Sequence, residues 1–163
     1  MKRIATMFAA MAGLSGCGLH PLYVGGSNGP VARSLAGVLV TPIEGRAGYL
    51  MRNALNDRLA TSGPVRYRLD VTLDDRIQGF GVRRDDAITR ERRSLRARFQ
   101  LVDASRGTVL LDATAGSDAG IDAVSSEFAT IAGENTALEN LSQTVADQIV
   151  ARIALYAQRS GEQ

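Results

Sequence analysis

Cys17 has the most distinctive chemical context of any residue in this sequence. It ends the segment Leu14-Ser15-Gly16-Cys17, which closes a short apolar run that begins after Lys2 and Arg3. A basic start, an apolar stretch of about ten residues and small residues before the cut are the parts of a secretory signal. A cysteine directly after the cut is where a bacterial lipoprotein receives a diacylglycerol on its thiol. We therefore expect Cys17 to be the lipid-bearing first residue of the mature chain; the alternative is a core cysteine after an apolar helix.

The leader predicts a lipid anchor rather than a membrane-spanning helix. A helix needs about 20 apolar residues to cross a bilayer, and this run is shorter. Two or three acyl chains hold a protein stably on a membrane, whereas a single chain binds only marginally. Residue 18 is Gly rather than the Asp that tends to retain such lipoproteins at the inner membrane. We expect the protein on the periplasmic side of the outer membrane.

Arginine is concentrated in one part of the chain. Guanidinium groups bind phosphate through paired hydrogen bonds and stay charged at physiological pH. For Arg96 and Arg98 we favour a solvated face with cross-strand ion pairs to Asp70, Asp74, Asp103 or Asp112. For Arg83, Arg84 and Arg90 fewer acidic residues are within reach, so an anionic ligand and a solvated surface remain equal alternatives. The cluster comprises seven arginines within sixteen residues: Arg83, Arg84, Arg90, Arg92, Arg93, Arg96 and Arg98.

Other chemistry is poorly represented in the sequence. His20 is the one histidine and Cys17 the one cysteine, so neither a disulfide nor a histidine-based metal or nucleophile site is expected. Gly79-Phe80-Gly81 lies between two expected strands, which predicts a bulge or loop rather than a phosphate-binding turn. The pairs Asp74-Asp75 and Asp85-Asp86 point to opposite faces on a strand and cannot share a proton. We expect no enzyme, no cofactor and no metal.

Composition predicts one domain after the leader. The 163 residues include 19 Lys and Arg and 17 Asp and Glu; losing Lys2 and Arg3 with the signal leaves 17 of each. A neutral mature chain gives no reason to expect nucleic acid as a partner. We expect a signal peptide over residues 1–16, a lipidated flexible linker over 17–34 with His20 in it, and a single domain over 35–160.

Hydrophobic periodicity predicts the elements that carry these residues. Val38–Thr41 is a short strand, Tyr49–Thr61 an amphipathic helix, and Tyr67 to about Ile77 a strand with period two. After a break over Gly79–Ala87, strands are expected to include Arg92–Leu101 and Thr108–Ala115, and a loop over Gly116–Ala123 leads to a helix from about Ser125 to Arg159. Strand, helix and strand form a crossover, so the first two strands should be parallel.

The expected fold is α+β, with two helices on one face of a four-stranded mixed sheet in the order β-α-β-β-β-α. The long helix should bury one apolar stripe; a coiled-coil partner for it is the alternative. Gly133 marks either a bend or a late start of that helix. The stripe consists of Phe128, Ile131, Ala132, Leu138, Leu141, Val145, Ile149, Ile153 and Tyr156.

The order of these features resembles the LPS-assembly lipoprotein LptE family of Gram-negative bacteria. The resemblance rests on short matches in order along the chain: Leu14 to Gly18, His20-Pro21-Leu22-Tyr23, Arg52-Asn53-Ala54-Leu55, Tyr67-Arg68-Leu69, Thr89-Arg90 and Arg152-Ile153-Ala154. It implies a protein that plugs the lumen of the LptD barrel, assists that barrel's assembly and contacts lipopolysaccharide. It also implies Arg83, Arg84 and Arg90 as contacts for the lipid A phosphates. The alternative is a periplasmic lipoprotein that serves as the auxiliary binding subunit of a transporter.

Overall fold

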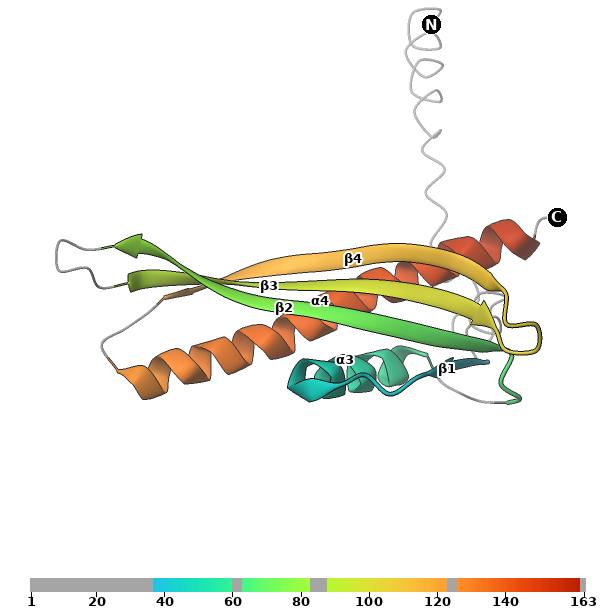
Figure 1. Ribbon diagram of the computed structural model, residues 1–163, viewed down its shortest axis with the longest axis horizontal. Helices are drawn as coiled ribbons and strands as arrows, with labels where there is room; N and C mark the ends of the chain where they lie inside the picture. The colour runs from blue at the N-terminus through green and yellow to red at the C-terminus, as the bar shows by residue number, and fades with distance from the viewer. Residues whose placement is uncertain (1–36, 60–62, 83–87, 123–125, 162–163) are drawn as a thin grey trace, which may run out of the picture.

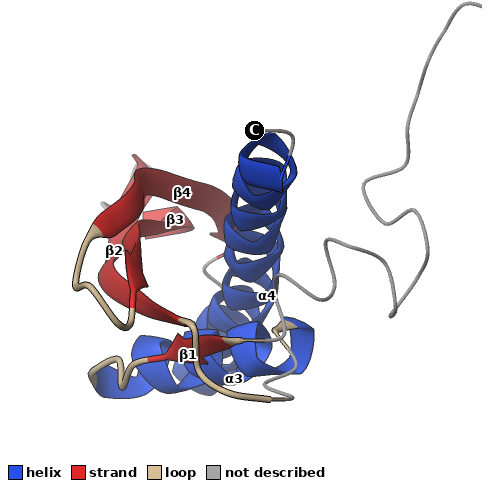
Figure 2. Ribbon diagram, turned by 90° about the vertical axis from the view of Figure 1, so that its right-hand side faces the viewer, coloured by secondary structure: helices blue, strands red, loops and turns tan. Residues whose placement is uncertain are grey.

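The computed structural model describes residues 37–59, 63–82, 88–122 and 126–161. They form a four-stranded sheet in the spatial order β1-β2-β3-β4 and two helices, arranged along the chain as β1, α3, β2, β3, β4 and α4. Figure 1 shows both helices on the same side of the long sheet, and Figure 2 shows the curved sheet partly wrapping around α4. The expected fold class is confirmed.

The parallel crossover at the start of the domain is also as predicted. Strand β1 (Val38–Val40) pairs in parallel with the beginning of β2. Helix α3 (Gly45–Arg58) connects them, and it begins four residues before the predicted Tyr49. Gly48 lies inside the helix, where a Cβ would collide with the carbonyl of Ile43. Glycine at this position permits a close backbone approach.

Strands β2 (Tyr67–Val82) and β3 (Ile88–Asp103) form one long antiparallel pair. The predicted break over Gly79–Ala87 is wrong as to its start, because Gly79 pairs with Glu91 and Phe80 with Arg90 in unbroken register. Gly79-Phe80-Gly81 is therefore part of a strand rather than a bulge or loop. Pairing with a continuous neighbouring strand outweighs the weak strand propensity of glycine.

Strand β4 (Val109–Asp122) also exceeds its prediction, since residues 116–122 were expected to form a loop. Gly116 pairs with Arg96, and pairing continues to Asp122 opposite Arg90. At about 3.3 Å per residue, the 16-residue strands reach about 50 Å. The 35-residue helix α4 (Glu127–Gly161) has the same length at 1.5 Å per residue. The sheet is long enough to lie beside the whole helix.

The apolar stripe of α4 is buried over only part of its length. Leu138, Leu141, Val145, Ile149 and Ile153 are at most 3% exposed and pack in one core with α3 and the sheet. Phe128 and Ile131 are 83% and 47% exposed, so the prediction of a continuous core stripe is wrong for the first turns. Figure 1 shows that α3 lies beside only the later part of α4, which leaves the first turns without a helical neighbour.

We call the two ends of the domain the base and the arm. A single row of paired residues, Asp75, Leu95 and Ser117, separates them. The base contains β1, α3 and the buried part of α4. The arm comprises β2 residues 76–82, β3 residues 88–94, β4 residues 118–122 and α4 residues 127–136.

Gly133 lies within α4 and close to β4. Helix α4 begins before Gly133, so a late start is wrong; a Cβ there would lie 3.3 Å from the Ile121 side chain. The helix starts after Ser126, whose hydroxyl accepts a hydrogen bond from the Ala129 amide at 3.4 Å. Neither of the two described helices has a stretch apolar enough to span a bilayer.

Candidate functional site

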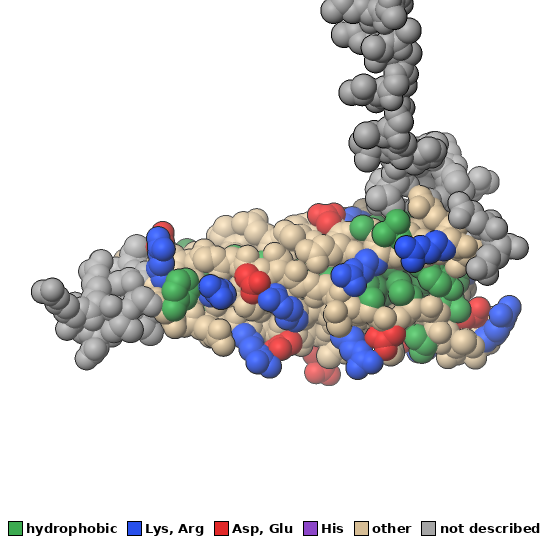
Figure 3. All heavy atoms as spheres, turned by 90° about the horizontal axis from the view of Figure 1, so that it is seen from above, with side chains coloured by type: hydrophobic (Ala, Val, Ile, Leu, Met, Phe, Trp, Pro, Cys, Tyr) green, Lys and Arg blue, Asp and Glu red, His purple; other side chains and the backbone are tan. Residues whose placement is uncertain are grey.

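The outer face of the sheet, opposite the helices, carries paired arginines and aspartates. Because side chains alternate along a strand, even-numbered residues of β2 and β3 point to this face while Leu69, Leu95 and Phe99 enter the core. Blue and red side chains alternate along this face in Figure 3. The ion pairs are Arg68–Asp70, Arg76–Asp74, Arg96–Asp118 and Arg98–Asp112.

Two of these pairs join neighbouring strands. Arg98 donates to Asp112 through Nε at 3.1 Å and Nη2 at 2.8 Å, and Gln100 adds a hydrogen bond at 2.9 Å to the same carboxylate. Arg96 donates to both oxygens of Asp118 at 3.1 and 2.9 Å. The expected pairing of Arg96 and Arg98 with acidic residues is therefore observed, although Asp118 was not among the predicted partners.

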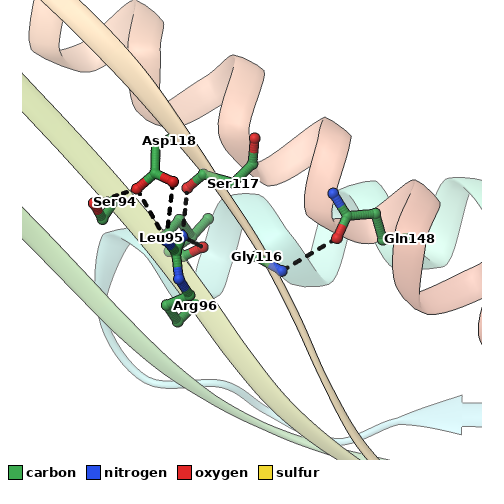
Figure 4. Close-up of polar contacts among 7 residues, drawn as sticks. All are labelled: Ser94, Leu95, Arg96, Gly116, Ser117, Asp118 and Gln148. Carbon is green, nitrogen blue, oxygen red and sulfur yellow. Dashed lines mark hydrogen bonds and ion pairs between the residues drawn. The ribbon is translucent and has the colours of Figure 1, made fainter.

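Gly116 fixes the position of the Arg96 side chain. A Cβ at Gly116 would collide with Arg96 Cδ, so glycine lets that side chain cross over β4 and donate to the Ser117 carbonyl at 2.9 Å. On the other edge of the strand, the Gly116 amide donates to Gln148 of α4 at 3.2 Å, as Figure 4 shows. One glycine thus links the outer face to the long helix.

A polar hollow of about 640 Å³ lies over these residues. Its floor includes the short side chains of Thr72 and Thr114, and Arg96 and Arg98 contribute to its lining. Arg152 reaches it from α4, and no ion pair of Arg152 is present among the described residues. The hollow offers arginine and threonine donors, and the apolar side chains of Leu73, Ala97 and Ala115 also line it.

Hydrogen bonding lowers the pKa values of two outer-face carboxylates. Hydrogen bonds from Arg98 and then Gln100 lower the pKa of Asp112 from 3.8 to about 2. Hydrogen bonds from Ser94 and then Arg96 lower the pKa of Asp118. Both groups stay ionised throughout the neutral range. The arginines they face are therefore largely neutralised by their own strand neighbours.

The arginines predicted to bind lipid A phosphates lie at the far end of the arm. Arg83 and Arg84 fall outside the described residues. Arg90 is exposed and makes an ion pair with Asp122 at 3.3 Å, so an acidic residue is closer than the sequence suggested. Its neighbour Arg92 lies over the Phe80 ring, with 5.3 Å between the guanidinium carbon and the ring centroid. The described part of this end presents arginine beside an exposed aromatic ring.

Cys17 and His20 also lie outside the described residues, so lipid attachment remains an expectation from the sequence. Among described residues, no group of three or more histidine, cysteine, aspartate or glutamate side chains could hold a metal ion.

One arginine of the cluster faces inward, which the sequence analysis did not single out. Arg93 is 9% exposed and holds Asp75 through two hydrogen bonds of 2.8 and 2.6 Å. It also donates to the Glu134 carbonyl of α4 at 2.9 Å. The sequence could have indicated this orientation, because side chains alternate along a strand. Arg93 stands two residues from Leu95 and so shares its inward face.

Comparisons with known proteins agree with this architecture. The model of the family described as "LptE: Lipopolysaccharide-assembly" matches residues 35–153. The chain is similar to the crystal structure of a candidate lipoprotein from Caulobacter crescentus, with 26% identity over 80% of this chain and 98% of that one, and a TM-score of 0.65. No curated protein matches the sequence.

Two less similar structures share the fold. Rare lipoprotein B from Shewanella oneidensis has a TM-score of 0.52 with 10% identity, covering 77% of this chain and 94% of its own. A lipoprotein B from Nitrosomonas europaea has a TM-score of 0.58 with 10% identity, covering 74% and 83%. Since the family model spans most of the chain, including every described strand, this protein belongs to the LptE family of lipopolysaccharide-assembly proteins.

Proposed function

We propose that this protein is an outer-membrane lipoprotein that plugs and assists assembly of an LptD-type barrel and contacts lipopolysaccharide during its delivery to the cell surface. The single observation that carries the proposal is the family match over residues 35–153. The fold supports it, because the sheet presents a long face of hydrogen-bonding side chains. The lumen of a large outer-membrane barrel is polar, and such a face can lie against it without burying unpaired apolar surface.

The anchor is the first part to test. Cys17→Ser removes the acceptor thiol and leaves every described contact of the domain untouched, so we expect a folded protein that leaves the membrane fraction. Fractionation after a salt wash, in cells without the barrel partner, measures this. Retention of the serine variant in the membrane under those conditions contradicts anchoring through Cys17.

Lipopolysaccharide contact is assigned to Arg83, Arg84 and Arg90. Replacing all three by Gln should weaken binding of lipopolysaccharide to the immobilised domain and leave its thermal melt nearly unchanged, because exposed charges contribute little to folding. Added salt should weaken binding by the unaltered protein as well, since exposed charges are screened over about 8 Å at physiological ionic strength.

The matched control is Arg96→Gln with Arg98→Gln. These two side chains are held by Asp118 and Asp112, so their loss should change lipopolysaccharide binding little. Equal binding by the triple variant and the unaltered protein would show that Arg83, Arg84 and Arg90 do not bind lipopolysaccharide. A larger loss in the double variant would move the site to the polar hollow.

The barrel partner is tested by purification from detergent-solubilised membranes. A β-barrel protein recovered in a one-to-one ratio supports the plug. Recovery of an inner-membrane ATPase instead would support the auxiliary transporter subunit. The LptE family assignment gives no reason to expect catalysis in either case.

A further inference from the structure

A cavity of about 210 Å³ opens at the end of the base where β1 begins and α4 ends. We call it the end cavity. Part of its lining belongs to the core, because Val38, Leu101 and Ile153 are each at most 2% exposed. These residues come from β1, β3 and α4, whose ends lie together at one end of the domain in Figure 1. A side chain that entered the end cavity would therefore touch the core itself.

The rest of the lining suits an aromatic side chain with a polar tip. Tyr67 and Tyr156 are half-buried and line the end cavity. Arg66 and Ser160 are exposed and supply polar groups at its opening. The Ser160 hydroxyl donates to the Tyr156 carbonyl at 3.0 Å, which leaves its oxygen as an acceptor. Aromatic rings pack favourably on one another, and a tyrosine hydroxyl requires a polar partner, so a tyrosine matches both parts of the lining.

The chain enters the domain at the wall of the end cavity. The Gly37 carbonyl accepts hydrogen bonds from the amides of Arg66 at 2.9 Å and Tyr67 at 3.0 Å, and both of these residues line the cavity. Val38, the next residue, lines it as well. The segment that precedes Gly37 is therefore tethered directly beside the cavity.

That segment contains one suitable side chain. Tyr23 is the only Phe, Tyr or Trp between residues 17 and 36, which lie outside the described residues. It stands fourteen positions before Gly37, and a flexible chain of that length has an end-to-end distance of about 20 Å. A short flexible tether keeps the local concentration in the millimolar range. A contact too weak to form between separate molecules can therefore form here.

We propose that the Tyr23 side chain docks in the end cavity and fastens the linker to the base. One consequence rests on the proposed function, because it requires the lipid on Cys17. With Tyr23 docked, the free tether is the six steps from Cys17 to Tyr23, at most about 20 Å, whereas the twenty steps from Cys17 to Gly37 reach about 70 Å. Docking thus keeps the base, rather than the arm, next to the bilayer.

Paramagnetic NMR on the whole chain from residue 17 tests the docking. It needs neither lipid nor barrel, so its result is independent of the proposed function. Cys17→Ser removes the natural thiol, and a nitroxide attached through Ser160→Cys lies at the opening of the end cavity. We expect the amide signals of residues 22–24 to lose most of their intensity and those of residues 27–29 to lose less. A linker without docking gives the reverse order, because residues 27–29 are nearer to Gly37 along the chain.

Three variants of the labelled chain sharpen this test. Tyr23→Phe retains the ring and should retain the maximum at residues 22–24, whereas Tyr23→Ser should abolish it. The matched control is Val31→Ser, which removes another apolar side chain of the linker and should leave the profile unchanged. Signal loss that rises steadily from residue 22 toward Gly37 in the unaltered linker overturns the proposal, and so does a maximum at residues 22–24 that survives Tyr23→Ser.

Discussion

The base and the arm share one sheet and one helix, yet they are stabilised differently. In the base, α3, α4 and four strands enclose Phe99, Met51 and Leu55, each fully buried. In the arm, a single helix covers the inner face, and the inward residue Ile77 of β2 is 41% exposed. Apolar burial stabilises the base, whereas the arm depends on strand pairing and a few polar contacts. A long sheet can therefore extend well beyond the core that makes it fold.

The largest difference in unfolding free energy between the two regions should come from placing an aspartate on α4 in each of them. Leu141→Asp puts a carboxylate into the base core, where Leu141 is 3% exposed, and should destabilise the protein by at least about 4 kcal/mol. Ile131→Asp in the arm should cost about 1 kcal/mol or less. Urea unfolding measures both, with Gln143→Asp as the exposed control in the base. Equal midpoints for Leu141→Asp and Ile131→Asp would show that the base and arm do not differ.

A smaller difference in unfolding free energy is expected when each of two adjacent aspartates at the boundary is replaced by alanine. Asp75 faces inward to Arg93, and Asp74 faces outward to Arg76. Removing one partner of the inner pair leaves a largely desolvated charge, so Asp75→Ala should cost about 2 to 3 kcal/mol. Asp74→Ala should cost about 0 to 1 kcal/mol, as is usual for exposed pairs.

Double-mutant cycles on both pairs give the interaction energies directly. The cycle for Arg93 and Asp75 should show coupling of about 1 to 3 kcal/mol, and the cycle for Arg76 and Asp74 less than about 0.5 kcal/mol. A larger coupling in the outer pair would contradict the assignment of Arg93 to a structural role.

The smallest expected effect is the loss of stability when Asp112, on the outer face of the base, becomes protonated at acidic pH. Because the pKa of Asp112 is lowered to about 2, its contribution to stability is present above the ordinary 3.8 and is lost as pH falls from there through about 2. Arg98→Gln removes the principal hydrogen bonds and should raise the Asp112 pKa toward 3.8. Carboxyl carbon NMR of Asp112 in both proteins checks this, and an unchanged titration midpoint would mean that Arg98 does not set it.

The sequence predicted the base better than the arm for a physical reason. Alternation at Leu95, Ala97, Phe99 and Leu101 reflects burial on one face, and each of these residues is in the core. At the boundary and in the arm no second helix requires apolar side chains. Inward positions there hold Asp75, Glu91 and Arg93, which are typical of a loop or a solvent-exposed face. The glycines at 79, 81 and 116 also favoured a loop prediction, although β2 and β4 continue through them.

The contacts of the candidate site could likewise be predicted only in part. Ion pairing of Arg98 with Asp112 could be predicted from residue type on expected strands. The pairing of Arg96 with Asp118 could not, because residue 118 was assigned to a loop and only an extended β4 brings it opposite Ser94. The hydrogen bond from Arg93 to the Glu134 carbonyl needed the position of α4 on the sheet, and sequence periodicity does not contain that information.

Photo-crosslinking tests the proposed place of the protein inside an outer-membrane barrel most directly. A photoreactive amino acid at Thr72, exposed on the outer face of the base, and another at Phe128, 83% exposed on the arm, sample both regions. A plug enclosed by a barrel wall should crosslink in intact cells from both positions to one outer-membrane β-barrel protein. Crosslinks from both positions to an inner-membrane transport protein, with none to a barrel, would contradict the account.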